Sequence, residues 1–454
     1  MAVSDAGGKN ERVPYAFGVQ EEGRSMPEID DYRDSSLRPA ERDHPMTFLP
    51  EPGPEEWFSP VISADDHVLE PFDLFTGRVA QRHRAGAPTV EIDGEGVPWW
   101  IIGDVRQQVF VLNGAVGRPM SEWDLAPQRY DEFRAGVIDV AERVKDMDLD
   151  GVWASVTFPS IVFGFAGTAL DRLPDPEVGL ACVRAYNDWL AEEWIDAVPG
   201  RFIPSQLTWL CDPLVAAGEV RRNAARGFRA VSFSENPEGL GFPGIHTDYW
   251  DPFFLACEET ETVVNLHVGS SGNVQHPSKL SPMDTMTALF PVNGMIAAVD
   301  WVYSRIPLRF PNLRIALSEA GVSWVPTILE RLHRAYRQVE ASVAWSRSDP
   351  APSDVLLRSF WFTSIEDPSA FHQLDLIGAD RVMVETDYPH QDSTWPNTQS
   401  MLRRQLSHLP DQQVADVCWR NAVHVYGATA PPEEWIERRR RTATVRPVMA
   451  GSIR

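Results

Sequence analysis

Several side chains of the kinds that bind metals or move protons follow short apolar runs in this chain. In the stretch VISADDHVLEP, at 61–71, a β-branched run ends at Asp65-Asp66-His67. Residues i and i+2 of a strand share a face, so Asp65 and His67 present a carboxylate and an imidazole together, and Asp66 faces the other way. Later apolar runs end in Glu235, His267, Glu319 and Asp387, and His390 follows three residues after the last.

These groups meet only if the apolar runs are parallel strands of one sheet. Eight such runs alternate with helical patterns, at 61–64, 151–158, 201–207, 228–235, 262–268, 313–319, 359–364 and 381–387. This alternation predicts an α/β fold, a (β/α)8 TIM barrel, whose chemistry lies at the C-terminal ends of its strands. A single carboxylate at a strand end is more often a cap or a hydrogen-bond acceptor. Six ligand-type residues on five strand ends predict a metal site.

The barrel accounts for residues 61–430 and leaves an extension at each end. Residues 1–60 are rich in Gly, Pro and charged side chains, and we expect an N-terminal extension that is partly disordered. The segment at 85–130 breaks the alternation with two or three strands around turns, which predicts a β-rich insertion after strand 1. Residues 431–454 form a C-terminal basic tail.

Composition narrows the class of partner. The 454 residues carry a formal charge of −24, which argues against nucleic acid or an anionic membrane surface as partner. The four cysteines lack C-x-x-C spacing, and no window approaches the roughly 18–20 apolar residues of a membrane span. We therefore expect a cytoplasmic protein that acts on a small molecule. No G-x-S-x-G elbow is present to supply a serine nucleophile.

Four motifs carry a resemblance to a known family. They are Asp65-x-His67, His267 in LHVGSSG, Glu319 in SEAGVSWVP and Asp387 in ETDYPHQDSTWP. Together they resemble the amidohydrolase superfamily, and most closely its amidohydrolase-2 branch of aminocarboxymuconate-semialdehyde decarboxylase and related decarboxylases. The resemblance implies an amidohydrolase-like barrel with a divalent metal on Asp65, His67, His267 and Asp387.

Other positions depart from the family pattern. An Asp replaces the usual first His, Glu319 stands where the decarboxylases carry a substrate-contacting His, and Glu235 stands where two-metal members carry a bridging lysine. Oxygen donors with few imidazoles favour iron or manganese over zinc. Because a single divalent ion leaves four carboxylates with a net negative charge, we expect two ions, with Glu235 or Glu319 as bridge. His390 is either a further ligand or a group that orients Asp387.

This ligand set also resembles the TIM-barrel non-haem diiron monooxygenases represented by the platensimycin and platencin biosynthetic hydroxylase. That resemblance implies two Fe ions, an external electron donor, a homodimer and hydroxylation of a bulky apolar, CoA-linked substrate. The alternative is a metal-dependent hydrolase or decarboxylase with one Zn, Mn or Fe ion. In either case we expect Asp387 and Glu319 to be catalytic. His246 and His276, on loops after strands 4 and 5, are either substrate contacts or structural residues.

Overall fold

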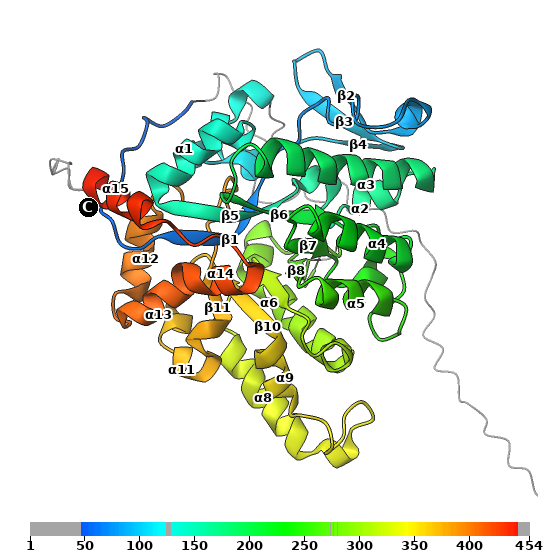
Figure 1. Cartoon of the computed structure of the whole chain (residues 1–454), viewed down its shortest axis with the longest axis vertical. Helices are drawn as coiled ribbons and strands as arrows, with labels where there is room; N and C mark the ends of the chain where they lie inside the picture. The colour runs from blue at the N-terminus through cyan, green and yellow to red at the C-terminus, as the bar shows by residue number, and fades with distance from the viewer. Residues whose placement is uncertain are drawn as a thin grey trace, which may run out of the picture.

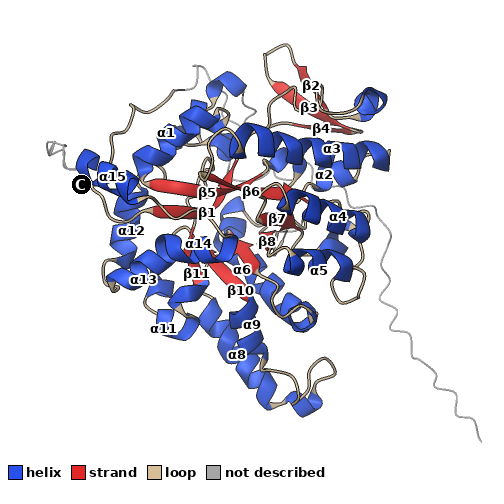
Figure 2. Ribbon diagram, viewed as in Figure 1, coloured by secondary structure: helices blue, strands red, loops and turns tan. Residues whose placement is uncertain are grey.

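The structure is a computed structural model, and it describes residues 47–109, 111–123, 129–272, 274–275, 277–278 and 280–443. Eight parallel strands form one sheet in the order β1-β5-β6-β7-β8-β9-β10-β11, at the centre of the molecule (Figures 1 and 2). Two backbone hydrogen bonds join the ends of the first and last strands, from the Asp387 amide to the Asp65 carbonyl (2.9 Å) and from the His67 amide to the Tyr388 carbonyl (2.6 Å). The predicted (β/α)8 barrel is therefore confirmed. Its strands are β1 Val61–His67, β5 Val152–Phe158, β6 Phe202–Leu207, β7 Ala230–Phe233, β8 Val263–His267, β9 Ile315–Ser318, β10 Phe360–Ser364 and β11 Val382–Val384.

Helices surround the sheet, and several begin at residues that suit a helix start. Asp139, Asp175 and Asp212 each accept hydrogen bonds from first-turn amides, and proline follows directly after the last two. The helices are α1 Val140–Asp150, α2 Thr168–Asp171, α3 Pro176–Leu190, α4 Pro213–Ala224, α5 Asp251–Glu259, α6 Met283–Tyr303, α7 Ile306–Arg309, α8 Val325–Arg337, α9 Pro352–Ser359, α10 Pro368–Phe371, α11 Leu374–Ile377, α12 Thr398–Leu406, α13 Asp411–Ala415, α14 Asn421–Tyr426 and α15 Glu433–Ala443.

Two apolar cores hold the barrel together. The larger one lies between the strands and the surrounding helices, and the smaller one fills the barrel interior with residues such as Ile62, Ala154 and Ala316. Helix α14 contributes Val425 and Tyr426 to the interior core, where the Tyr426 hydroxyl donates to Asn265 Oδ1 (3.0 Å). Side chains therefore fill the barrel interior, and we expect the reactive groups at the strand ends.

The segment between β1 and α1 contains a second, antiparallel sheet, β2 Thr89–Ile92, β3 Pro98–Ile102 and β4 Val105–Gln107. It lies beside α3 at the edge of the molecule (Figure 1). Trp100 of β3 is buried against Phe75 and Phe163 in edge-to-face contacts, with ring centroids 6.2 and 5.1 Å away. This ring therefore packs the sheet onto the barrel.

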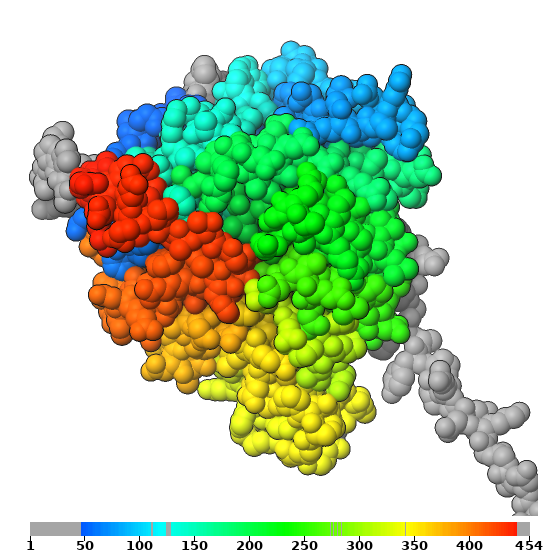
Figure 3. All heavy atoms as spheres, in the orientation of Figure 1, coloured from blue at the N-terminus to red at the C-terminus, as the bar shows by residue number. Residues whose placement is uncertain are grey.

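The first described residues contact the segment between β1 and α1, where Thr47 binds Glu122, and α15 packs its Trp435 against Trp57 and Trp153. The corner between α8 and α9 projects from the rest of the surface (Figure 3). The expected disorder of residues 1–46 and the end of the basic tail, 444–454, lie outside the described residues.

Helix α6 contradicts the expectation that no stretch of this chain is apolar enough to span a membrane. Its residues Asp284–Tyr303 are long and apolar enough to cross a membrane, by length and composition only. In the structure the helix packs against α7, α8, α9 and β9, as a helix of the barrel. Only 33% of this apolar stretch is buried in the structure, chiefly near its C-terminal end at Ala298, Trp301 and Val302.

Candidate metal centre

The ends of β1 and β11 bring the first ligand-type residues together. An irregular register between Ser63 and Asp66 interrupts the β1–β5 ladder, and both Asp65 and His67 are wholly buried at the mouth. Strand β11 ends at Val384, and Asp387 has a left-handed backbone, with φ of 47°. Glu319, directly after β9, has φ of 52°. Non-glycine residues in this region carry backbone strain, which clusters at functional sites.

The side chains of Asp65, His67, His267 and Asp387 converge on one point. His67 Nε2 lies 3.3 Å from Asp65 Oδ1, 3.4 Å from Asp387 Oδ1 and 3.3 Å from His267 Nε2. His267 Nε2 lies 3.4 Å from Asp65 Oδ2. Ligands about 2.1 Å from a common ion are separated by about 3.0–3.4 Å, depending on the coordination geometry. These four residues are therefore spaced as the ligands of one ion would be.

The hydrogen bonds within this group also fit a metal. His67 Nδ1 lies 3.0 Å from the Pro159 carbonyl, and His267 Nδ1 lies 2.8 Å from the Val268 carbonyl. A carbonyl only accepts, so each Nδ1 carries the proton and each Nε2 presents a lone pair to the cluster. All four carboxylate oxygens of Asp65 and Asp387 are buried without a hydrogen-bond partner. Buried polar atoms are rarely left unpartnered, and a cation would satisfy these.

Burial and the charges of neighbouring side chains set the electrostatics of the cluster. Burial, and then the carboxylates of Glu385, Asp387 and Glu319, hold the pKa of Asp65 well above its usual range. Burial, and then the Glu319 charge, also raise the pKa of Asp387. Burial, and then the neighbouring imidazoles of His390 and His267, hold the pKa of His67 well below its usual range, which favours the neutral, ligating form.

A second set of groups extends the cluster on its more exposed side. His390 Nδ1 lies 3.0 Å from Asp387 Oδ1 and 3.9 Å from Glu319 Oε1, and its ring stacks on His67 with centroids 3.9 Å apart. Glu319 Oε2 also lies 3.7 Å from His267 Nε2. Three overlapping groups could each hold an ion: Asp65, His67 and His267; His67, Asp387 and His390; and Glu319, Asp387 and Asp392.

Glu235 is the predicted ligand that lies outside all three groups. Strand β7 ends at Phe233, and the Glu235 carboxylate accepts from the Ser271 hydroxyl (2.7 Å) and the Gly269 amide (3.1 Å). Burial raises the pKa of Glu235 to about 7. The structure thus directs this carboxylate to the loop after β8.

Two acids were missed by the sequence reasoning. Asp392 belongs to the third group, and the buried Glu385 accepts from the Glu319 amide at 3.2 Å. Both belong to the motif around Asp387, so the sequence did offer a signal in the form of further acids at i−2 and i+5.

The two histidines of the long loops are not part of the cluster. His246 lies on the surface with Nε2 2.8 Å from Asp300 Oδ1. His276 lies outside the described residues.

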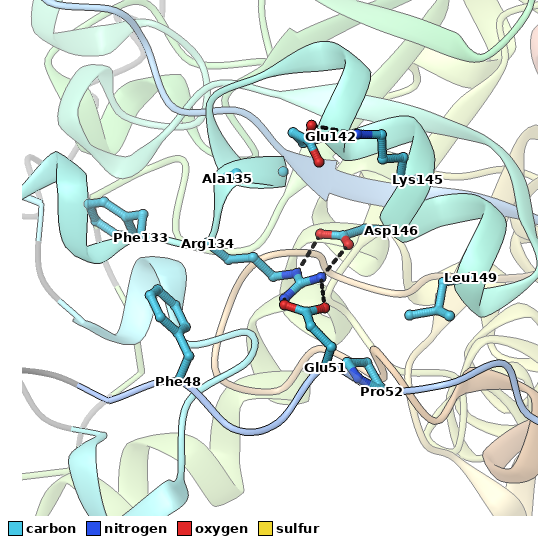
Figure 4. Close-up of a pocket in the computed structure, with 11 residues that line it drawn as sticks. Phe48, Glu51, Pro52, Phe133, Arg134, Ala135, Glu142, Lys145, Asp146 and Leu149 are labelled. Carbon is cyan, nitrogen blue, oxygen red and sulfur yellow. Dashed lines mark hydrogen bonds and ion pairs between the residues drawn. The ribbon is translucent and has the colours of Figure 1, made fainter.

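A cleft of about 530 Å³ lies away from the cluster, between α1 and the N-terminal segment. Arg134 crosses it with paired hydrogen bonds to Asp146 (both 2.8 Å) and to Glu51 (both 2.9 Å) (Figure 4). No ligand-type residue of the cluster lines it. Its volume therefore does not mark the reaction centre.

Comparison with known proteins finds a family that this chain matches and solved structures with the same fold. A family model described as amidohydrolase matches residues 173–428. An amidohydrolase from Mycobacterium avium subsp. paratuberculosis K-10 superimposes with a TM-score of 0.65 at 21% identity, over 81% of this chain and 99% of that one.

Two decarboxylases have the same fold. The 5-carboxyvanillate decarboxylase of Sphingomonas paucimobilis gives a TM-score of 0.57 at 20% identity, over 82% of this chain and 99% of that one. The second is the dihydroxybenzoic acid decarboxylase of Polaromonas sp. JS666, with bound manganese and the inhibitor 2-nitroresorcinol. It superimposes with a TM-score of 0.57 at 17% identity, over 82% of this chain and 97% of that one.

Proposed function

The chain belongs to the amidohydrolase family, and from that premise we propose that it is a divalent-metal-dependent decarboxylase of a small aromatic acid. The observation that carries the proposal is the convergence of Asp65, His67, His267 and Asp387, with two Nε2 lone pairs and four unpartnered carboxylate oxygens at one point. The decarboxylases of the same fold support the reaction, and manganese in one of them supports the kind of ion.

The chain's own residues have separate roles in this proposal. A divalent ion held by the four ligands would polarise a substrate oxygen and stabilise the charge that develops on it. Decarboxylation breaks the bond between the ring and the carboxylate, releases CO2 and leaves an electron pair that a proton takes up. His390 stands beside Asp387 on the less buried side, where its imidazole can deliver that proton. Glu319 stands beside both as a carboxylate, because its burial is outweighed by His267 and His390, which lower its pKa.

A direct assay tests the proposal. Manganese-loaded protein is incubated with a panel of carboxylated and hydroxylated benzoic acids, and released CO2 is measured against the Asp387→Asn variant. We expect CO2 from at least one acid with the parent protein and none with the variant. Metal-loaded protein that releases CO2 from no member of the panel would refute the assignment.

A second function is favoured by the size of the ligand set. Together the three overlapping groups contain four carboxylates, one of them that of Asp392, and three imidazoles. One divalent ion would leave these carboxylates with a net negative charge, and two would neutralise it. Four carboxylates with histidines are also the donors of di-iron carboxylate sites, which supports a diiron monooxygenase. A CoA-linked substrate, an electron donor and a homodimer remain predictions of that function.

Metal stoichiometry separates the two functions, with Glu319 and Glu235 as a matched pair. If two ions bind, Glu319→Gln should lower the metal content from about two to about one per chain, and Glu235→Gln should leave it unchanged. The oxygenase also requires two irons and O2 uptake. A single manganese or zinc ion per chain, with no response to O2, would exclude it.

A further inference from the structure

We propose that Phe165 forms the wall of the substrate site and selects planar, aromatic acids over saturated ones. This inference rests on the proposed function, because it names the class of substrate that the metal cluster receives. Phe165 lies after β5, in the sequence IVFGFAGT, and no motif in the sequence marks it as functional.

The Phe165 ring contacts the histidines of the cluster. It stacks on the His267 imidazole, with centroids 3.9 Å apart and planes inclined by 22°. Its centroid lies 5.1 Å from that of His67 and 6.3 Å from that of His390. The histidines at 267 and 67 are buried, whereas Phe165 is only partly so. Part of the Phe165 side chain is therefore exposed, and its ring lies beside the rings of the metal ligands, where we expect a bound molecule to contact it.

The backbone holds this ring over the cluster. Gly164 and Gly167, on either side, have φ of +67° and +77°, a conformation that other residues rarely adopt. A side-chain carbon at 164 would come within 2.5 Å of Thr168 Oγ1. The Ser232 hydroxyl, at the end of β7, donates to the Phe165 carbonyl. The loop therefore fixes the position of Phe165, as preorganised recognition requires.

A second phenylalanine contacts the same histidines from within the barrel. Phe158, the last residue of β5, has its ring 5.2 Å from His267 and 5.8 Å from His67, and it is fully buried. Phe158 can affect the site only by packing, because no surface of it is free to meet a ligand. It is therefore a matched control for Phe165.

The Phe165 ring favours flat ligands. Offset-stacked aromatic rings attract each other beyond the apolar area that they bury, whereas a saturated ring gains only the area. A molecule that places one oxygen on the ligand cluster lies within reach of the Phe165 ring. Discrimination between aromatic and saturated acids thus follows from one side chain.

The test measures binding of ring acids to manganese-loaded protein by calorimetry. The ligands are hydroxybenzoates and their cyclohexane counterparts, and the proteins are the parent, Phe165→Leu and Phe158→Leu. We expect the parent to prefer the aromatic acid about tenfold, Phe165→Leu to lose this preference at unchanged manganese content, and Phe158→Leu to keep it while lowering the melting temperature.

Each other outcome counts against the inference. Equal binding of both acids by the parent, binding of neither, or a preference that survives in Phe165→Leu would overturn it. CO2 assays on the same proteins distinguish the two proposals. Aromatic preference without CO2 release refutes only the decarboxylase assignment, and CO2 release without the preference refutes only the role of Phe165.

Discussion

Asp65 and Asp66 are adjacent in the chain and both are fully buried, yet their carboxylates have opposite surroundings. Neither oxygen of Asp65 has a hydrogen-bond partner, whereas Asp66 Oδ1 accepts from Thr386 Oγ1 (2.6 Å), the Tyr388 amide (3.0 Å) and Ser63 Oγ (3.1 Å). One strand end thus presents a ligand to one side and a structural acceptor to the other. Burial alone therefore does not identify a functional acid, whereas buried oxygens without hydrogen-bond partners do.

The largest expected effect comes from the unpartnered side. Asp387→Asn removes a carboxylate from the point where the ligands converge, so we expect turnover and tight metal binding to fall below detection. In excess chelator the variant should melt at the same temperature as the parent or higher, because burial and then the Glu319 charge disfavour an ionised carboxylate at 387, and asparagine removes that cost. Metal analysis and thermal unfolding check both. A variant that is destabilised in chelator would break the comparison.

Substitution of the hydrogen-bonded Asp66 should instead lower the stability of the protein. Asp66→Ala removes the shared acceptor of three donors and leaves the buried Tyr388 amide without one, so we expect a loss of about 3 kcal/mol in the free energy of unfolding. Urea unfolding in chelator measures it, with Asp65→Ala as the matched control. If both variants lose the same stability, the two acids do not differ in the way described.

Asp150, a buried acid outside the cluster, should make the stability of the protein depend on pH. Burial raises the pKa of Asp150 to about 8, although both of its oxygens accept from Thr398. The folded state therefore keeps a proton that the unfolded state releases near pH 4, and the stability from this group is lost as pH rises through about 8. Between pH 6 and pH 8 we expect parent stability to fall about 2 kcal/mol relative to Asp150→Asn. Parallel profiles for the two proteins would show that Asp150 is ionised throughout.

The smallest effect concerns the support behind the cluster. Arg143 is fully buried and donates to the carbonyls of His67 and Gly136, both at 2.6 Å, with its guanidinium 4.1 Å from the Tyr388 ring centroid. We expect Arg143→Lys to weaken manganese binding about tenfold, because residues that orient ligands act at that level.

Arg201 is the control for this prediction, since it donates to the carbonyls of Trp153 and Val152 at the opposite end of β5. Arg201→Lys should lower stability without changing manganese affinity. Chelator competition measures both variants, and equal affinities would remove Arg143 from the set of positioning residues.

Most of the fold was predictable because its signals are local. Apolar runs of strand length alternate with amphipathic patterns, and aspartates such as Asp139 and Asp212 mark where helices begin. Helix ends were less predictable, and between β10 and β11 the chain forms two short helices, α10 and α11. Helix α10 packs on α12 whereas α11 packs on α8, and no local pattern encodes these two partners.

The candidate site was predictable in part. Strand ends indicated Asp65, His67, His267, Glu319 and Asp387, and the structure brings these together with His390. The same rule also selected Glu235, because the sequence does not show where a strand stops before an acid. Strand β7 ends two residues before Glu235, and the loop after β8 donates two hydrogen bonds to its carboxylate.

The sequence by itself determined that this chain is a parallel barrel with acids and histidines at its strand ends, because strand period and residue type are properties of the chain. Only the tertiary structure decided which of these groups are partners. Asp65 lacks a hydrogen-bond donor and Asp66 has three, Glu235 turns to a loop, and Phe165 lies on His267. Those distinctions depend on atoms from distant strands arriving within about 3 Å of one another, a distance at which hydrogen bonds and metal ligation are made or lost.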